Sequence, residues 1–356
     1  MLGLDRRAAR YAWTIVLVVL ALWLVYVVRT TLFVFILALL FAHLLSPLVD
    51  FLDRVLPSSR TRTPALGLTY VILVAVLTLV GIQIGTRVVE QANNLSQKLP
   101  QMLASWEKPR QATAAPTSLK DQILDKARTE IGARSSDILA ALSRAGLKAL
   151  TVAGDLIYVV IIPIVAFFFL KDGHLLRDQL LEMIPQGQHR ALMDELLTEA
   201  HLLLSRYIRA LVLLSLATFT AYSIFFAIVG LSYTILLAAL AALLEFIPLL
   251  GPLTAGIVIL IVAGVSGGPV AAILIFLLAY RIFQDYVLSP YFMGQGVELH
   301  PLLVLFGVFA GGELGGIAGT FLSIPVLALA RIIFLHLRRS RRHFRNVTTP
   351  AGTLQS

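Results

Sequence analysis

The chain has 356 residues, of which 58% are hydrophobic and 14% charged, and its mean hydropathy is +0.87. A soluble domain is nearer half apolar and a quarter charged, so this composition indicates a polytopic membrane protein. There is no cysteine, which excludes disulfides, thiolate metal sites and a cysteine nucleophile. The net charge of +9 comes from basic residues in loops and tails beside apolar stretches. That placement is typical of the positive-inside pattern and argues against nucleic-acid binding.

Three apolar stretches near the N terminus predict transmembrane helices at about residues 11–28, 32–48 and 65–84. The first is followed at once by the second and lacks a small-residue cleavage site. We therefore interpret it as a retained helix and not as a signal peptide. Basic residues before the first helix and after the second predict that both of these flanks are cytoplasmic.

Residues 87–148 form the one long polar stretch, where charges of both signs are mixed. Leu and Ile recur at helical spacing from Leu119 to Leu150, which predicts a small helical extramembrane domain. A fourth apolar helix is expected over residues 150–170, ended by charge and glycine at Lys171–His174. The segment 175–206 is typical of a cytoplasmic amphipathic helix.

Two later apolar segments are each interrupted by a carboxylate together with helix-breaking residues. The first is Glu245-Phe-Ile-Pro-Leu-Leu-Gly-Pro, and the second runs from Glu313 through a glycine-rich stretch to Pro325. Broken backbone at membrane depth is tolerated only where it packs in protein or lines a wet cavity. Each interruption therefore predicts a re-entrant hairpin, and such a pair is typical of a secondary-transporter site.

The predicted fold class is an all-α polytopic membrane protein with about six full transmembrane helices and two re-entrant hairpins in an inverted repeat, with a small helical extramembrane domain. Eight or more full spans are the alternative. The predicted parts are the N-terminal transmembrane helices (1–86), the extramembrane domain (87–149), transmembrane helix 4 with the amphipathic helix (150–206), the transport core of helix 5, hairpin 1, helix 6 and hairpin 2 (207–336), and a basic cytoplasmic tail (337–356).

Six segments carry a resemblance to a known family. They are LLSPLVDFLDR (44–54), FFFLKDG (167–173), SRYIRA (205–210), LLEFIPLLGPLTAG (243–256), QDYVLSPYFMGQGVELHPLLVLFGVFAGGELGGIAG (284–319) and SIPVLA (323–328). With them the chain resembles the autoinducer-2 exporter family of prokaryotic membrane proteins, from the first helix to Leu335. The match is strong from Ser205 onward and weak in residues 87–148.

The resemblance implies export of a small molecule, which is autoinducer-2 in one branch of the family, and Na⁺(Li⁺)/H⁺ antiport in other branches. It also implies a homo-oligomer, with a pentamer as the expected assembly, and an elevator-like moving part. The motifs identify the family, but they do not identify the cargo.

Glu245 is the first candidate for a coupling carboxylate. Pro248, Gly251 and Pro252 break the helix pair beside it and leave free backbone groups to meet a polar cargo. Partial dehydration at this depth would suit the carboxylate to proton exchange. The alternative is a structural carboxylate that caps a half-helix or pairs with an arginine.

Glu313 takes the analogous position in the second hairpin. Gly312 and Gly315 allow close backbone approach there, and Pro325 lies further along the same hairpin. The alternative is that glycine packing at the hairpin tip leaves Glu313 at the water boundary.

Asp285 and Gln284 form a polar cluster with Arg281 and Tyr280 in helix 6. Arg281 and Asp285 are i,i+4 and can pair on one helix face, as a substrate contact or as an interfacial anchor.

Tyr207 and Arg209 open helix 5, where Arg209 could neutralise Glu245, bind an anionic group of the cargo or extend to lipid headgroups. Pro290 is expected to hinge the loop that follows helix 6, in gating or as plain turn geometry.

The chain contains no hydrolase elbow, phosphate-cradling loop, dinucleotide fingerprint or HExxH motif, so we expect no enzyme, no cofactor and no metal site. The expected function is a secondary active transporter that exports a small polar molecule, coupled to an ion gradient. Its partners would be that molecule or a monovalent cation, membrane lipid and further copies of the chain. We expect a multi-pass protein of a prokaryotic inner membrane with both termini cytoplasmic. A non-transporting oligomeric scaffold and a passive channel are the alternatives.

Overall fold

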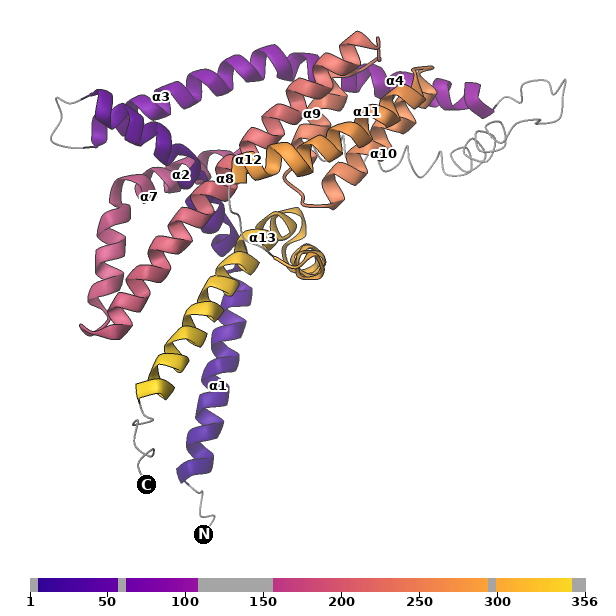
Figure 1. The fold of residues 1–356 in the computed structure, drawn as a ribbon. Coiled ribbons are helices and arrows are strands. Elements are labelled where there is room, and N and C mark those ends of the chain that lie inside the picture. Colours follow the sequence, from indigo (N-terminus) through magenta and orange to yellow (C-terminus); the bar gives the residue numbers. More distant parts are fainter. Residues whose placement is uncertain (1–5, 57–61, 108–155, 294–298, 348–356) are drawn as a thin grey trace, which may run out of the picture.

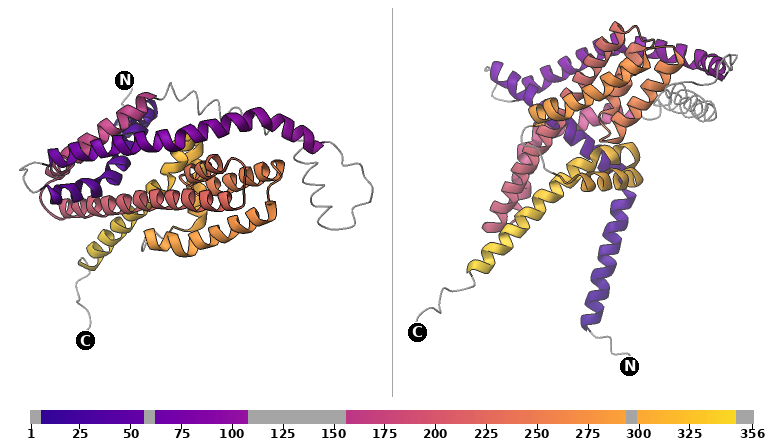
Figure 2. Two further views of the ribbon diagram at one scale, coloured as in Figure 1. Left: turned by 90° about the horizontal axis from the view of Figure 1, so that it is seen from above. Right: turned by 45° about the vertical axis from the view of Figure 1, so that its right-hand side comes forward.

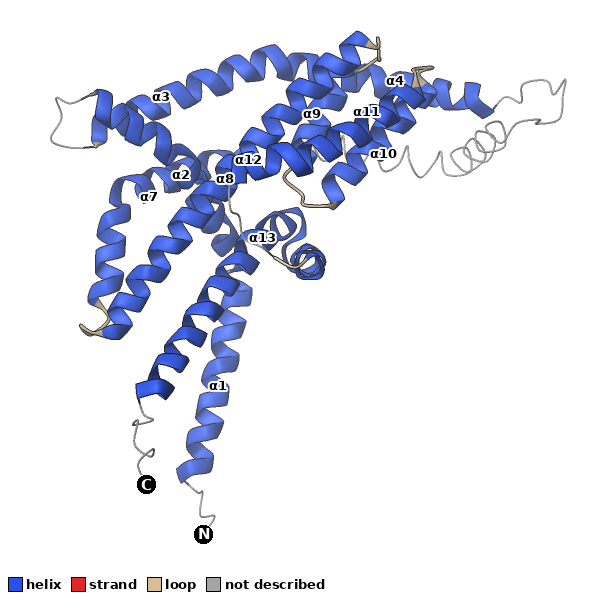
Figure 3. Ribbon diagram, viewed as in Figure 1, coloured by secondary structure: helices blue, strands red, loops and turns tan. Residues whose placement is uncertain are grey.

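The computed structural model describes residues 6–56, 62–107, 156–293 and 299–347. Over these residues the chain is helical without strands, and short turns join the helices (Figure 3). Seven of the described helices are long and apolar enough to cross a membrane. The prediction of an all-α polytopic membrane protein is confirmed at this level. Most of the predicted extramembrane domain lies outside the described residues.

The described helices, in chain order, are α1 (Arg6–Val27), α2 (Arg29–Val55), α3 (Thr63–Val80), the π-turn η1 (Gly81–Gly85), α4 (Thr86–Glu107), α7 (Leu156–Glu182), α8 (Gln188–Ile228), α9 (Thr234–Leu244), α10 (Leu250–Val265), α11 (Val270–Phe283), the π-turn η3 (Gln284–Leu288), α12 (Ser289–Met293) and α13 (Pro301–Val347).

Helix α1 stands away from the rest of the described fold (Figures 1 and 2). Every residue from Arg10 to Val27 is exposed, although the segment is apolar on all sides. A helix of this kind is suited to a lipid environment or to burial against another chain.

The helix that begins at Thr63 does not end near Ile84, as its apolar pattern predicts. It continues through η1 into α4, and the three elements form one long helix across the top of Figure 1. The π-turn contains two glycines, Gly81 and Gly85, and the helix continues through it. Contacts with α9 support the extension, since the Leu236 amide donates to the Gln91 side chain at 2.9 Å.

Helices α7 and α8 form a long antiparallel pair. The expected helix end near Lys171 and the separate amphipathic helix after it are wrong, because α7 runs on to Glu182 and α8 begins at Gln188. A single helical glycine costs only about 0.5–1 kcal/mol, so Gly173 is a weak stop signal. Across the pair, Arg177 contacts Asp194 at 2.6 Å and donates to the Thr198 hydroxyl at 2.7 Å.

The largest buried cluster lies where α8, α9, α10 and α11 meet, and α4 contributes Leu95 to it. Phe225 of α8 and Phe276 of α11 stack with ring centroids 3.9 Å apart. Tyr222 meets Phe276 edge-on at 5.3 Å. These aromatic contacts fix the position of α11 against α8.

Helix α13 contains a sharp turn at Gly315–Gly316, where the backbone angles are not helical. It therefore consists of a first arm (301–314) and a second arm (317–347). A Cβ atom on Gly311 would collide with the Gly319 backbone, and one on Gly319 with the Gly311 backbone. The two arms thus fold back on each other in a hairpin whose backbones touch at these glycines.

Candidate functional site

The connection between α9 and α10 is a strained turn. The Leu250 amide donates to the Pro248 carbonyl at 2.7 Å, and Leu249 between them has φ +65° and ψ −54°. These angles correspond to the rare γ-turn that residues with side chains seldom adopt. Strain of this type persists only where the surrounding structure enforces it, and it is concentrated at functional sites.

Close packing surrounds this turn. A Cβ atom on Gly251 would overlap the Leu244 carbonyl oxygen, so only glycine fits there. The Ser215 hydroxyl of α8 donates to the Ala242 carbonyl at 2.7 Å, which satisfies a group in the last turn of α9. Pro252 lies in the first turn of α10, where a missing backbone N–H breaks no helical hydrogen bond.

Glu245 immediately follows α9, and its side chain is only 9% exposed. The Gln284 side-chain amide donates to the Glu245 carboxylate. Arg281 Nη1 lies 3.9 Å from the same carboxylate oxygen. A buried charge is unfavourable unless it is paired, and these two groups on η3 and α11 provide the pairing.

Arg281 also contacts Asp285, with 2.9 Å between Nε and Oδ2. The Asp285 side chain is 46% exposed, so the cluster is sheltered at Glu245 and open at Asp285. Two carboxylates against one guanidinium leave one uncompensated negative charge when both acids are ionised. This arrangement can attract a proton or another small cation.

The π-turn η3 begins at Gln284 and places that residue inside, with 3% exposure, while Asp285 points outward. A π-turn inside an α-helix is frequently found at functional sites. The turn therefore gives two consecutive polar residues different environments in one cluster.

Two residues of α8 lie next to these groups. The Thr218 hydroxyl lies 3.1 Å from the Tyr280 hydroxyl and beside the Glu245 carboxylate. The Tyr222 ring lies 5.2 Å from the Tyr280 ring. Sequence reasoning missed Thr218 and Tyr222. The only available signal was a pair of hydroxyl residues one turn apart in an apolar helix.

We call Thr218, Glu245, Tyr280, Arg281, Gln284 and Asp285 the Glu245 cluster. Three of the predicted site residues, Glu245, Gln284 and Asp285, come together in it. Arg281 takes the place near Glu245 that was one alternative for Arg209, and Arg209 is exposed on α8. Glu313 is also exposed, near the end of the first arm of α13.

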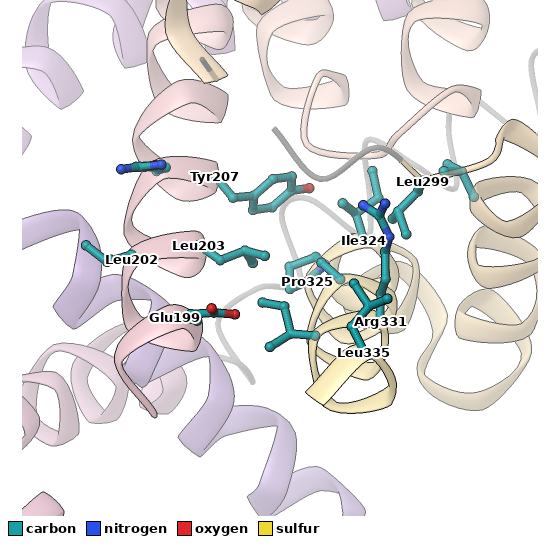
Figure 4. Close-up of a pocket in the computed structure, with 13 residues that line it drawn as sticks. Glu199, Leu202, Leu203, Tyr207, Leu299, Ile324, Pro325, Arg331 and Leu335 are labelled. Atoms are coloured by element: carbon teal, nitrogen blue, oxygen red, sulfur yellow. The ribbon is translucent and has the colours of Figure 1, made fainter. Parts of the chain in front are cut away.

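Tyr207 lies elsewhere, in a cleft of about 470 Å³ between α8 and α13. Figure 4 shows Tyr207, Leu203 and Glu199 extending from α8 toward Pro325 on α13. The Tyr207 hydroxyl is buried and has no hydrogen-bond partner among the described residues. Pro325 is therefore a cleft residue.

The remaining predicted hinge residues are Gly312, Gly315 and Pro290. A Cβ atom on Gly315 would collide with the Phe33 ring of α2, and one on Gly312 would crowd the Thr320 hydroxyl. Pro290 lies inside a helix and not in the loop after it, because η3 continues α11 into α12 without a break; its predicted role as a hinge of that loop is wrong.

The long apolar helices and the sheltered charge cluster beside an interrupted helix pair are the features of a polytopic membrane transporter. The chain belongs to the AI-2E transporter family, and the sequence profile of that family matches residues 14–339. This confirms the family resemblance that its motifs indicate.

The relatives of this chain carry transport names. It is 28% identical to "Putative transport protein MT0215" of Mycobacterium tuberculosis, over 91% of this chain and 89% of the relative. It is 24% identical to "Putative transport protein YueF" of Bacillus subtilis, over 88% and 85% respectively. It is 27% identical to "Putative transport protein YrrI" of the same organism. That match covers only about half of each protein, 51% of this chain and 51% of the relative.

Proposed function

We propose that this protein is a secondary active transporter that exports a small polar molecule, with Glu245 as the carboxylate that couples export to an ion gradient. The observation that carries the proposal is the Glu245 side chain, 9% exposed and bonded to Gln284, at the strained break between α9 and α10. Family membership and the transport names of the relatives support it.

The coupling step follows from the contacts of the carboxylate. When Glu245 is ionised, Gln284 and Arg281 hold the end of α9 against α11. Protonation removes the negative charge that attracts Arg281, and Arg281 keeps Asp285 as its ion-pair partner. The contact between the hairpin and α11 then weakens. The protonation state of one residue thereby biases the position of the α9–α10 hairpin.

Exchange of Na⁺ or Li⁺ for protons is the second candidate. Small hard cations prefer oxygen ligands, and the Glu245 carboxylate lies beside the hydroxyl of Thr218, which contacts that of Tyr280. The uncompensated negative charge of the cluster favours the same ligand class. On this reading the cation is the cargo and the proton competes with it for Glu245.

In the proposed architecture, α9–α10 and the two arms of α13 are re-entrant hairpins. Helices α9 and α10 have 11 and 16 residues, fewer than the roughly 20 that a full span needs. Helix α8 with the first hairpin and α11–α12 with the second would form the inverted repeat. Basic residues at both chain ends support a prokaryotic inner-membrane protein with cytoplasmic termini, and the exposed α1 supports a homo-oligomer.

The test is flux in proteoliposomes made with the purified full-length chain and loaded with a pH-sensitive dye. One arm imposes a Na⁺ or Li⁺ gradient and records the internal pH. The other arm follows autoinducer-2 release driven by a pH gradient. We expect flux above protein-free vesicles in at least one arm, and a loss of about tenfold or more with Glu245→Gln, which is about 1.4 kcal/mol.

Glu182→Gln is the matched control, because Glu182 is an exposed carboxylate at the end of α7. It should transport like the parent chain. Equal flux in the Glu245→Gln and parent proteins would remove the coupling role. No flux in either arm would contradict both candidate activities and favour a non-transporting scaffold.

A further inference from the structure

A second group of ionisable side chains joins the N-terminal half of α8 to the second arm of α13. It consists of Glu195, Glu199 and His336, whose ligand atoms all lie within 4.8 Å of one another. Glu199 precedes Thr218 of the Glu245 cluster by 19 positions on α8, which corresponds to about 28 Å along the helix. This trio is therefore separate from the Glu245 cluster.

The trio has the geometry of a binding site. Glu195 and Glu199 are i,i+4 on α8 and so share one face. His336 Nε2 lies 3.5 Å from Glu195 Oε1 and 3.7 Å from Glu199 Oε1. The carboxylates remain 57% and 42% exposed, so an ion can reach the site from one side.

The surroundings of the His336 ring favour a cation beside it. Its side chain is 4% exposed, and Nε2 is buried without a hydrogen-bond partner among the described residues. The other ring nitrogen, Nδ1, lies 3.0 Å from the Ile332 carbonyl and donates to it. With the Nδ1 proton used in this way, Nε2 of the neutral ring carries a lone pair directed at two carboxylates. Such an arrangement is unfavourable unless a cation lies between them.

The distances favour a metal ion over a proton. N–H···O hydrogen bonds span about 2.7–3.2 Å, shorter than both Nε2–carboxylate distances. Ligand atoms on tetrahedral zinc, with bonds of about 2.0–2.2 Å, are separated by about 3.3–3.6 Å; the 3.5 Å to Glu195 lies in this range and the 3.7 Å to Glu199 is just above it. Histidines that bind metals also commonly donate their second N–H to a backbone carbonyl, as His336 does to Ile332.

We propose that Glu195, Glu199 and His336 bind a divalent transition-metal ion such as Zn²⁺, with His336 coordinating through Nε2. Two carboxylates balance the charge of the ion, and imidazole favours Zn²⁺ over Mg²⁺ or Ca²⁺. Three protein ligands leave a fourth position for water. The bound ion ties α13 to α8 beside the cleft in Figure 4, which Glu199 and Leu335 line.

The test is calorimetric titration of Zn²⁺ into the full-length chain, purified in detergent without a histidine tag and treated with EDTA. We expect one site per chain. His336→Gln should weaken binding by about 100-fold or more, since changes outside the ligand shell alone cost about 10–100-fold. The controls are His189→Gln and Glu182→Gln, which change exposed residues and should bind like the parent chain.

A second variant tests the proposal even if His336→Gln does not fold. The double variant Glu195→Gln/Glu199→Gln keeps the buried ring, should melt like the parent chain in EDTA, and should lose the rise in melting temperature that Zn²⁺ causes. Binding of the parent that is no tighter than millimolar, or equal binding in the double variant, would overturn the proposal. A proton would then occupy His336 Nε2 and the trio would be an ion pair. Neither outcome depends on transport activity.

Discussion

The two interrupted hairpins begin from the same sequence pattern, a glutamate beside helix-breaking residues, and differ in structure. In α9–α10, Glu245 is sheltered and bonded to Gln284 of the neighbouring η3. In α13, Glu313 is exposed, and the turn is made by Gly315–Gly316. A strained leucine in a γ-turn forms the first break, whereas glycines that relieve strain form the second.

The difference shows that a carboxylate at a helix break is not sufficient to make a site. What distinguishes Glu245 is a second helix that presents Gln284 and Arg281 to it. The arms of the α13 hairpin pack on each other through Gly311 and Gly319, and no such pair of polar side chains is found at Glu313 among the described residues. The following experiments test this contrast.

The largest effect is expected from Gly251→Ala. The added Cβ would overlap the Leu244 carbonyl oxygen, and overpacking of this kind costs about 1–3 kcal/mol or more. We expect a lower melting temperature in detergent and loss of the monodisperse peak on size exclusion. Gly256→Ala is the control, because its Cβ would meet only Leu277 at 3.9 Å. Equal melting temperatures would contradict backbone contact at the turn.

Glu313→Gln in the flux assay sharpens the comparison of the two carboxylates. Because Glu313 is exposed, we expect less than about a twofold change, against a loss of about tenfold for Glu245→Gln. Equal losses in both variants would show that the hairpins act symmetrically despite their different environments.

Thr218→Val removes a hydroxyl beside Glu245 at nearly constant volume. A hydrogen bond contributes about 0.5–1.5 kcal/mol, and here Tyr280 loses the Thr218 hydroxyl, so we expect a flux loss of about twofold to tenfold. Thr220→Val is the control, since Thr220 is exposed and, within the described part of the chain, its hydroxyl bonds only the Leu216 carbonyl of its own helix. Equal flux in the Thr218→Val and Thr220→Val proteins would exclude Thr218 from the site.

The smallest effect is expected from Leu249→Gly. Glycine adopts the positive φ of this turn without strain, so the folded state should gain up to about 1 kcal/mol, seen as a higher melting temperature. Leu253→Gly, at an exposed position in α10, should instead lose about 1 kcal/mol. A lower melting temperature of both variants would indicate that contacts of the Leu249 side chain stabilise the fold by more than its backbone strain destabilises it.

Local patterns located several features of the fold. The breaks at Pro248–Gly251 and at Gly315–Gly316 were predicted, because proline and glycine act on the backbone where they stand. Helix ends predicted near Ile84 and Lys171 were wrong, because packing against other helices outweighs one or two weak stop signals.

Within the candidate site, the sequence identified every member of the Glu245 cluster except Thr218, but not their arrangement. Pairing of Arg281 with Asp285 follows from i,i+4 spacing and needs no tertiary information. Pairing of Gln284 with Glu245 joins two helices, and no local rule predicts it. The same limit hid His336, whose carboxylate neighbours lie on a distant part of the chain.

Composition and the positions of proline and glycine were enough to define a helical membrane protein, its apolar spans and the places where they break. Hydropathy and backbone preference are local properties of the sequence. Packing alone decided that Glu245 is sheltered and Glu313 is not, and that Glu195, Glu199 and His336 meet. Burial and charge pairing depend on which helices lie side by side, and similar local patterns are compatible with several such arrangements.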